Sequence, residues 1–161
     1  MNDIVKRARR LRRGTSFETH ELGRVFEHHW GRTINAGDNS LFSTVFLYFN
    51  PMTFNAPFAA AHGHKGIIIN PLLVFNTVLG LTVEDLSEAG GAFLGVDELE
   101  YLEPVYEGDT LRARSTVIDK RDSQSWPKHG VVTWLTEGFN QEGKKVISFK
   151  RTNMVVREAH R

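Results

Sequence analysis

The sequence contains no cysteine, so a disulfide scaffold, thiolate catalysis and cysteine–zinc sites are excluded. A strong net charge is also missing, because 20 Lys and Arg residues are matched by 19 Asp and Glu residues. Hydrophobic residues make up 40% of the chain and charged residues 24%, which is typical of a globular protein. The length of 161 residues predicts one domain that can bury a core of its own.

Long hydrophobic runs are missing as well. The most apolar segment, Leu72 to Leu81, is interrupted by Asn76 and Gly80 and is shorter than the ~20 residues of a membrane-spanning helix. Gly14 to Glu21 follows the first charged residues, where a secretory signal would place an apolar stretch. We therefore expect no membrane span, no signal peptide and a cytoplasmic protein.

The near-zero net charge hides an asymmetry along the chain. Residues 1–13 carry a net charge of +5, and the rest of the chain carries −4. We expect a basic arm over residues 1–19, a folded domain over 20–157 and a tail over 158–161. The arm suits nucleic acid, an anionic membrane or the acidic surface of another subunit. The alternative that we favour is a solvated terminal segment, so we assign neither a nucleic-acid nor a membrane partner.

Helical patterns occupy the first half of the chain. Polar residues 35–39 precede apolar residues at helical spacing through Phe49, and Asn50-Pro51 ends that helix, because proline disfavours helical geometry in the preceding residue. A short helix is expected over 57–61. Asn70 and Pro71 then begin a helix that is apolar almost all round, which we expect to be surrounded by protein over about residues 71–82.

Strand patterns dominate after Gly90-Gly91. Residues 93–102, 110–118, 131–139 and 146–156 read as strands, and polar and apolar residues alternate in the second of them. Residues 140–143 join the last two strands as a hairpin turn. One buried helix followed by antiparallel strands predicts an α+β fold in which the sheet wraps around the helix.

Four sequence segments carry a resemblance to a known family. They are 31–42 at the beginning of the first helix, Asn50-Pro51-Met52, Pro57-Phe58-Ala59, and the run 104–111 before a long strand. Over residues 20–157 the chain resembles the MaoC-like hydratase/dehydratase family with the hot-dog fold. Within that family it is most similar to one half of the two-domain mesaconyl-CoA hydratases, also called β-methylmalyl-CoA dehydratases.

The resemblance implies an activity and partners. The implied activity is that of a lyase, which hydrates or dehydrates a short or branched acyl-CoA thioester. It implies no cofactor, and we assign no metal site. It also implies a homodimer or higher oligomer, or a hetero-oligomer with a catalytic MaoC-like chain. Two other functions stay open: a non-catalytic subunit that binds acyl-CoA or completes a partner's pocket, and an acyl-CoA thioesterase.

The residues that usually perform the family's chemistry are replaced. Members usually carry Asp and His in a Gly-Asp-x-Asn-Pro-x-His pattern, which supplies the acid and base that hydration needs. Aligning Asn50-Pro51 with the pattern places Tyr48 at the Asp position and Thr53 at the His position. We therefore assign Tyr48 and Thr53 to substrate binding.

Two substitutes for the missing acid and base are Asp38 and His64. Asp38 stands at the start of the first predicted helix, where it either faces the thioester or only caps the helix. His64 stands in a loop before the apolar helix and titrates in the range of a proton shuttle, although a solvated loop residue is the alternative.

Further candidates for substrate binding lie in two places. Asn70, Leu72 and Leu73 begin the apolar helix, where free N–H groups could stabilise charge on the thioester oxygen. Arg112 and Arg114 share one face of a strand and are candidates for contacts with the CoA phosphates.

Overall fold

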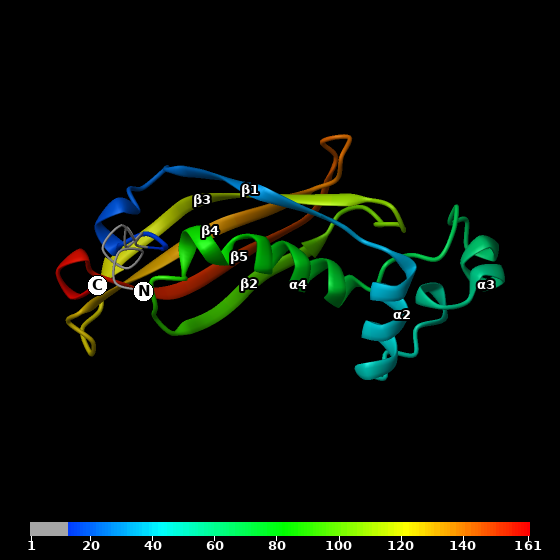
Figure 1. Cartoon of the computed structure of the whole chain (residues 1–161), viewed down its shortest axis with the longest axis horizontal. Helices are drawn as coiled ribbons and strands as arrows, with labels where there is room; N and C mark the ends of the chain where they lie inside the picture. Colours follow the sequence, from blue (N-terminus) through cyan, green and yellow to red (C-terminus); the bar gives the residue numbers. More distant parts are fainter. Residues whose placement is uncertain (1–12) are drawn as a thin grey trace, which may run out of the picture.

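The computed structural model describes residues 13–161. The expected basic arm therefore lies outside the described residues as far as Arg12. Five antiparallel strands form one sheet in the order β1-β3-β4-β5-β2 (Figure 1). Their bounds are Val25–Thr33 for β1, Phe93–Tyr101 for β2, Thr110–Asp122 for β3, His129–Phe139 for β4 and Lys145–Val156 for β5. The four predicted strands and the 140–143 hairpin are confirmed, and β3 is longer than predicted.

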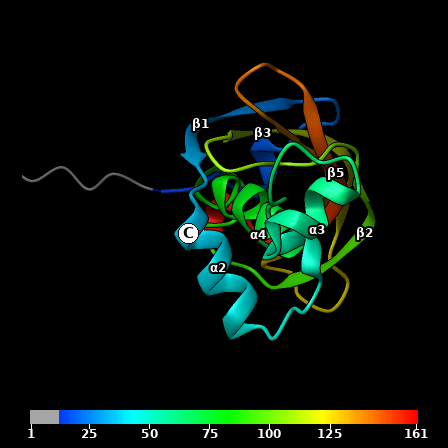
Figure 2. The ribbon, with the colours of Figure 1, turned by 90° about the vertical axis from the view of Figure 1, so that its right-hand side faces the viewer.

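Helix α4, Pro71–Leu81, runs along the concave face of this curved sheet, as the end-on view makes clear (Figure 2). Val74 and Val78 are buried against the inward residues of the strands, among them Leu111 and Phe149. The expectation that protein surrounds this helix is only partly met. The sheet covers one side, and Leu72 on the opposite side is 42% exposed. A single curled sheet can enclose only part of a helix that is apolar on all sides.

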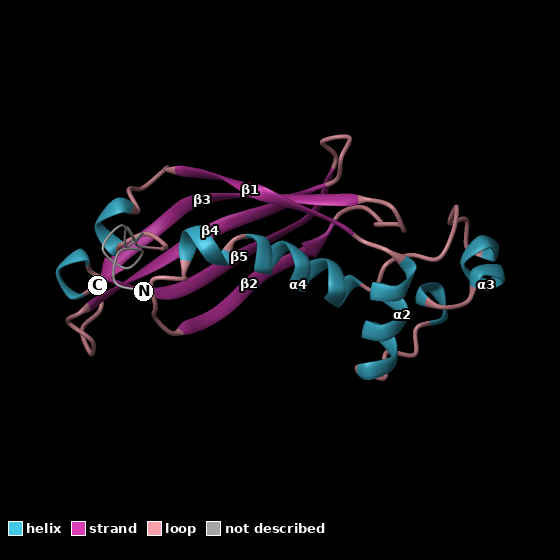
Figure 3. Ribbon diagram, viewed as in Figure 1, coloured by secondary structure: helices cyan, strands magenta, loops and turns pink. Residues whose placement is uncertain are grey.

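Three short helices lie beyond one end of the sheet, next to the N-terminus of α4 (Figure 3). They are α2, Ala36–Val45; the 3₁₀ helix η2, Pro51–Thr53; and α3, Ala56–Ala61. The prediction that the first helix reaches Phe49 is wrong, because it ends four residues earlier. Leu47 adopts a left-handed φ of 52°, and Tyr48 N donates to Ser43 O at 2.9 Å, which closes the helix.

Both described ends of the chain lie at the opposite end of the sheet (Figure 1). There the 3₁₀ helix η1, Phe17–Thr19, buries Phe17 in a second core cluster with Leu86 of helix α5, Val83–Leu86. The packed body therefore begins before the expected boundary at residue 20. At the other terminus, the 3₁₀ helix η3, Glu158–His160, is followed by Arg161, which donates to the carbonyl oxygens of Arg13 and Gly14. Within residues 13–161, no helix combines the length and the apolar character needed to cross a bilayer.

Candidate functional site

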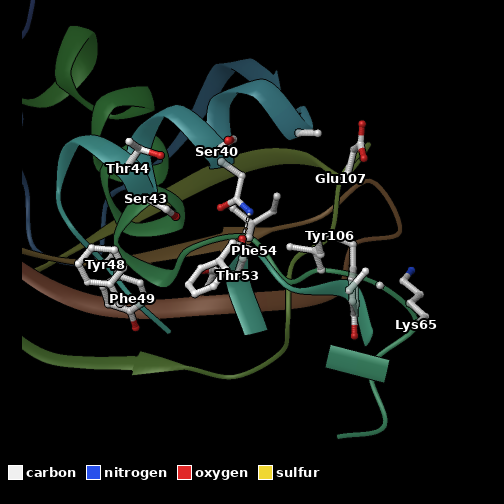
Figure 4. Close-up of a pocket in the computed structure, with 16 residues that line it drawn as sticks. Ser40, Ser43, Thr44, Tyr48, Phe49, Thr53, Phe54, Lys65, Tyr106 and Glu107 are labelled. Atoms are coloured by element: carbon white, nitrogen blue, oxygen red, sulfur yellow. Dashed lines mark hydrogen bonds between the residues drawn. The ribbon is translucent and has the colours of Figure 1, made fainter. Parts of the chain in front are cut away.

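A cavity of about 690 Å³ lies beside α2, and Ile69, two residues before α4, is among the residues that line it. Sixteen residues line it, from α2, the segment 48–56, the segment 65–69 and the pair Tyr106-Glu107. Figure 4 shows the hydroxyl-bearing side chains of α2 along one side, Tyr48 and Phe49 at one end, and Lys65 and Glu107 at the other. The cavity therefore has an aromatic end, a hydroxyl-lined wall and a charged end.

Asparagine side chains begin every helix around this cavity. Each residue accepts a hydrogen bond from a backbone N–H that the helix leaves unpaired. The caps are Asn35 for α2, Asn50 for η2, Asn55 for α3 and Asn70 for α4. The local sequence thereby fixes where each of the four helices around the cavity begins.

A buried polar network forms the floor of the cavity. Asn39 Oδ1 accepts from Asn70 N at 2.7 Å, and Asn39 Nδ2 donates to Thr53 O at 3.0 Å. Asn70 Nδ2 donates to Ser43 Oγ at 3.1 Å. The amide groups are thus occupied within the protein, while Ser43 keeps its own O–H to donate to a ligand in the cavity.

The predicted substrate-binding residues Tyr48 and Thr53 both line the cavity. Thr53 is 1% exposed, and its hydroxyl donates to Asn50 O at 2.8 Å. Tyr48 lies beside Tyr101 of strand β2: burial raises the pKa of the Tyr101 phenol, and Tyr48 raises it further. The positions that the family motif assigns to acid and base are therefore in the cavity, but they carry hydroxyl groups.

Asp38 and His64 lie near the cavity without lining it. Asp38 forms a capping box with Asn35 and an ion pair with Arg32 at 3.0 Å. His64 Nδ1 is 3.1 Å from the hydroxyl oxygen of Tyr106, which does line the cavity. Asp38 thus has the capping geometry, and His64 reaches the cavity only through Tyr106.

The beginning of α4 lies beside the cavity floor, but its N–H groups are already used. Asn70 Oδ1 accepts from Leu72 N at 3.0 Å, and Asn70 O accepts from Leu73 N at 2.9 Å. A thioester oxygen would have to displace these bonds to be stabilised here. The role of Leu72 and Leu73 stays a prediction.

Arg112 and Arg114 share one face of β3 and alternate with Leu111 and Ala113, which are buried against α4. They therefore lie on the outer face of the sheet, away from that helix. Arg114 donates to Glu137 Oε2 at 2.7 Å. Burial pushes the pKa of Glu137 upward, but hydrogen bonds from Lys145 and Arg114 outweigh it and hold this pKa below its ordinary value.

Sequence reasoning assigned only Tyr48 and Thr53 among the sixteen residues that line the cavity, and it missed Ser43, Lys65, Tyr106 and Glu107. Ser43 carried a usable signal, because it follows Asn39 by four residues in α2, which places the two polar side chains on the same face of the helix. Lys65, Tyr106 and Glu107 gave no such signal, since the fold brings them to the cavity from segments about 40 residues apart. No group of three or more His, Asp or Glu side chains that could hold a metal occurs within the described part of the chain.

A curled antiparallel sheet around one helix, with a cavity at the helix N-terminus, defines a hot-dog domain. A protein from Mycobacterium tuberculosis described as having a double hot-dog fold superimposes with a TM-score of 0.80 at 21% identity, over 90% of this chain and 45% of that one. The family model described as mesaconyl-CoA hydratase matches residues 1–160. The chain belongs to the mesaconyl-CoA hydratase family.

Individual relatives agree with this assignment. A mesaconyl-CoA hydratase from Haloarcula hispanica is 36% identical over 157 residues, which cover 97% of this chain and 44% of the relative. A β-methylmalyl-CoA dehydratase from Chloroflexus aurantiacus is 37% identical over 142 residues, 88% of this chain and 40% of the relative.

The structure of a putative MaoC domain protein dehydratase from the same organism superimposes with a TM-score of 0.84 at 35% identity. That match covers 90% of this chain and 41% of the other. The chain thus spans less than half the length of these relatives.

Proposed function

We propose that this chain acts in the hydration or dehydration of a short, branched acyl-CoA thioester. The observation that carries the proposal is the position of the cavity. It is lined by Tyr48 and Thr53, at the two positions where the family motif places its acid and base. Because acyl-CoA thioesters are made and consumed inside cells, the proposal places the chain in the cytoplasm.

The residues offer one route by which the chain itself could move protons. Tyr106 lines the cavity, and its hydroxyl oxygen lies at hydrogen-bond distance from the His64 ring. A proton that leaves Tyr106 for a bound substrate could be replaced from His64. Ser43 would donate its hydroxyl hydrogen to the thioester oxygen, and Asp38 would have to leave its capping box to take part.

Turnover by the purified chain tests this route. We expect loss of ultraviolet absorbance of the enoyl thioester when mesaconyl-CoA is added. His64→Gln and Tyr106→Phe should each lower kcat by about 10²-fold, the usual contribution of a general acid or base. Asp119→Asn, an exposed change on β3, serves as the control and should leave kcat unchanged. Unchanged rates in both variants would exclude the route.

A second function is favoured by what the cavity contains. Among the described residues that line it, Glu107 is the only carboxylate and none is a histidine. A subunit that only binds the thioester, while a partner supplies the acid and base, would need no further carboxylate or histidine in its cavity.

An experiment that restores the family's acid and base distinguishes an active enzyme from a binding subunit. The double variant Tyr48→Asp, Thr53→His reinstates the family's acid and base in the existing cavity. If the chain is a binding subunit, the wild type should bind thioester without turnover, and the double variant should gain turnover. If the wild type is itself active, the change should not raise its rate. The matched control Tyr48→Phe, Thr53→Val alters the same positions without adding a titratable group.

We also propose that the chain pairs with a second hot-dog unit, as a homodimer or with a catalytic chain. Exposed apolar side chains lie next to the cavity at Phe46, Leu47 and Phe49, with 60%, 68% and 77% of their surfaces accessible. The unpaired edge of β2 exposes Phe93 and Leu94 as well. Surfaces of this kind mark protein contacts. Light scattering of the purified chain should give the mass of at least a dimer, alone or after mixing with a catalytic chain.

A further inference from the structure

Residues 54–67, which include α3, form a loop whose two ends are held at one point of α2. Asn39 Nδ2 donates to Thr53 O at 3.0 Å and to Ile68 O at 3.3 Å, directly before and directly after the loop. Ile68 N also donates to Met52 O at 3.1 Å, which ties the two ends to each other. The part between them projects beyond the sheet with α3 (Figure 3). We call residues 54–67 the flap, because a loop with adjacent, fixed ends can turn as a unit.

The flap is held together by its own hydrogen bonds. Asn55 caps α3, and His64 N donates to Ala59 O at 3.1 Å, which folds the chain after α3 back onto this helix. His62 Nδ1 lies 2.8 Å from Phe58 O, and the rings of these two residues stack with their centres 4.2 Å apart. The flap can therefore move without losing its internal structure.

Tyr106 is the residue that holds the flap against the rest of the domain. Its hydroxyl oxygen lies 3.1 Å from His64 Nδ1, and the Lys65 ammonium nitrogen lies 4.4 Å from the centre of its ring. Within the described chain, the other hydrogen bonds and ring contacts of the flap are made with itself or with residues 50–53. Tyr106 is itself fixed, because its backbone N–H donates to Asp109 Oδ2 at 2.8 Å. Two contacts with one fixed side chain therefore keep the flap closed.

The flap also forms part of the cavity wall. Phe54, Ala56 and residues 65–67 line the cavity together with Ser43 and Thr44 of α2 (Figure 4). A ligand in the cavity touches these flap residues only while the flap is closed, so it binds the closed form more tightly than the open form. Ligand binding should consequently shift the flap toward the closed form.

We propose that the flap opens to admit a thioester and closes over it, with Tyr106 as the latch. Thr53 and Ile68 act as the hinges, because Asn39 keeps both in place. Opening breaks the two contacts with Tyr106 and leaves the hydrogen bonds of Asn39 intact. The inference rests on the proposed function for the identity of the ligand, whereas the opening itself belongs to the free protein as well.

The absence of cysteine from the chain allows the flap to be followed with a pair of spin labels. Ala60→Cys on α3 and Asp119→Cys on β3, both at exposed positions, report the distance from the flap to the sheet. We expect an open and a closed distance in the free protein, and the closed distance alone after addition of isobutyryl-CoA, a branched thioester that cannot be hydrated. The control pair Glu100→Cys and Asp119→Cys lies on the sheet and should give one distance in both conditions.

Loss of the latch should shift the flap toward the open form. The double variant His64→Ala, Lys65→Met removes both contacts with Tyr106, so we expect the ratio of open to closed flap to rise about tenfold. Ala61→Ser, an exposed change on α3, is the matched control and should leave the ratio unchanged.

Two results would overturn the inference. One is a single flap distance that neither isobutyryl-CoA nor the double variant changes, because the flap would then be a fixed wall. The other is a flap distance that depends on protein concentration instead of ligand, because the flap would then be a contact between subunits. If the double variant opens the flap but isobutyryl-CoA does not bind, the result contradicts the proposed function and supports the latched flap.

Discussion

Three side chains of the cavity floor depend on one another. Asn39, Ser43 and Asn70 are almost fully buried, and each hydrogen-bonds to another member of the group or to its backbone. Buried amides are costly to leave unpaired, so this cluster fixes the distance between α2 and the beginning of α4. Ser43 is the member with bonding capacity left over for a ligand.

Ser43→Ala should therefore have two effects. It leaves Asn70 Nδ2 buried without an acceptor, which should lower the free energy of unfolding by about 1–3 kcal/mol in urea titrations. If the chain binds a thioester as proposed, Ser43→Ala should also weaken that binding, because the proposed donor to the thioester oxygen is lost. Ser40→Ala, an exposed change on the same helix, is the control for stability alone and should alter the free energy of unfolding by less than about 0.5 kcal/mol. Equal effects of the two variants on the free energy of unfolding would contradict the prediction.

His20 makes stability depend on pH. It is fully buried, and burial lowers its pKa to about 4. The unfolded chain binds a proton near pH 6.5 and the folded protein does not, so stability is complete above that pH and falls as pH drops toward 4. The loss from this residue should reach roughly 3 kcal/mol at pH 4, measured as the difference in unfolding free energy from pH 7.

The control for this pH dependence is a histidine variant on the surface. His29 is exposed, so His29→Gln should keep the wild-type pH profile, whereas His20→Gln should flatten it. Part of the slope should survive in His20→Gln, because burial also lowers the pKa of His28. A profile unchanged by His20→Gln would contradict the assignment.

His28 also belongs to a hydrogen-bonded chain with the order found in serine hydrolases. Its Nδ1 donates to Asp85 Oδ2 at 2.6 Å, and its Nε2 lies 3.0 Å from Ser115 Oγ. Ser115 is fully buried, however, and the cluster joins β1, β3 and α5 rather than lining the cavity. No substrate can reach this serine, so the cluster stabilises the fold.

At the scale of elements, the early end of α2 shapes the cavity. The turn at Leu47 directs Tyr48 and Phe49 back toward the cavity instead of continuing the helix. The position that closes this kind of helix end usually holds glycine, because a Cβ atom disfavours the left-handed conformation. Leu47 occupies it with a φ of 52° and with 68% of its surface exposed.

Leu47→Gly should consequently stabilise the isolated protein. Relief of the left-handed strain exceeds the added freedom of the unfolded chain, so we expect a gain of about 0.5–1 kcal/mol in the free energy of unfolding. Val45→Gly, two residues earlier and at the last residue of the helix, should instead cost up to about 0.5 kcal/mol, because glycine is a weaker helix former than valine. Destabilisation by both variants would show that the Leu47 side chain contributes contacts that outweigh its strain.

At the scale of the whole molecule, α4 packs closely on the sheet because β4 carries a glycine there. A Cβ atom at Gly138 would lie 2.5 Å from Ile147 Cγ2 and 2.7 Å from Val78 Cγ2. The helix can approach the strands only where this side chain is missing. Gly138 thus allows the close distance between α4 and the sheet.

Gly138→Ala should therefore force the helix and sheet apart. We expect a loss of about 1–3 kcal/mol, the usual cost of overpacking a core, and a lower melting temperature. Gly95→Ala on edge strand β2, where an added Cβ meets nothing within 4 Å, is the matched control. It should be neutral or slightly stabilising. A melting temperature unaffected by Gly138→Ala would mean that the core relaxes freely.

The whole molecule also leaves apolar surface that no single domain covers. Leu72 on α4 and Phe93 on the edge strand are 42% and 52% exposed, and the apolar end of α2 lies beside the cavity. A second unit that covered these surfaces would also adjoin the cavity. A partner bound at these surfaces would therefore lie where it could supply acid and base groups to the cavity.

Much of the fold could be predicted from local sequence. The alternating pattern of 110–117 gave a strand, Asn70-Pro71 gave the beginning of α4, and the Asn-Pro step placed Tyr48 and Thr53, which do line the cavity. These features depend on residues close together in the chain. The end of α2 could not be predicted, because a leucine in a left-handed turn runs against its own preference.

The sequence by itself determined the α+β class and the absence of thiol chemistry, because both follow from residue identity and spacing, and its Asn-Pro step predicted that Tyr48 and Thr53 stand at the family's acid and base positions. Only the tertiary structure decided that Asp38 forms a capping box, that Ser43 faces the cavity with a hydroxyl hydrogen to donate, and that Lys65 reaches its charged end beside Tyr106. The physical reason is distance along the chain. Local patterns fix helices and strands, but contacts between residues about 40 positions apart exist only once the sheet has curled around α4.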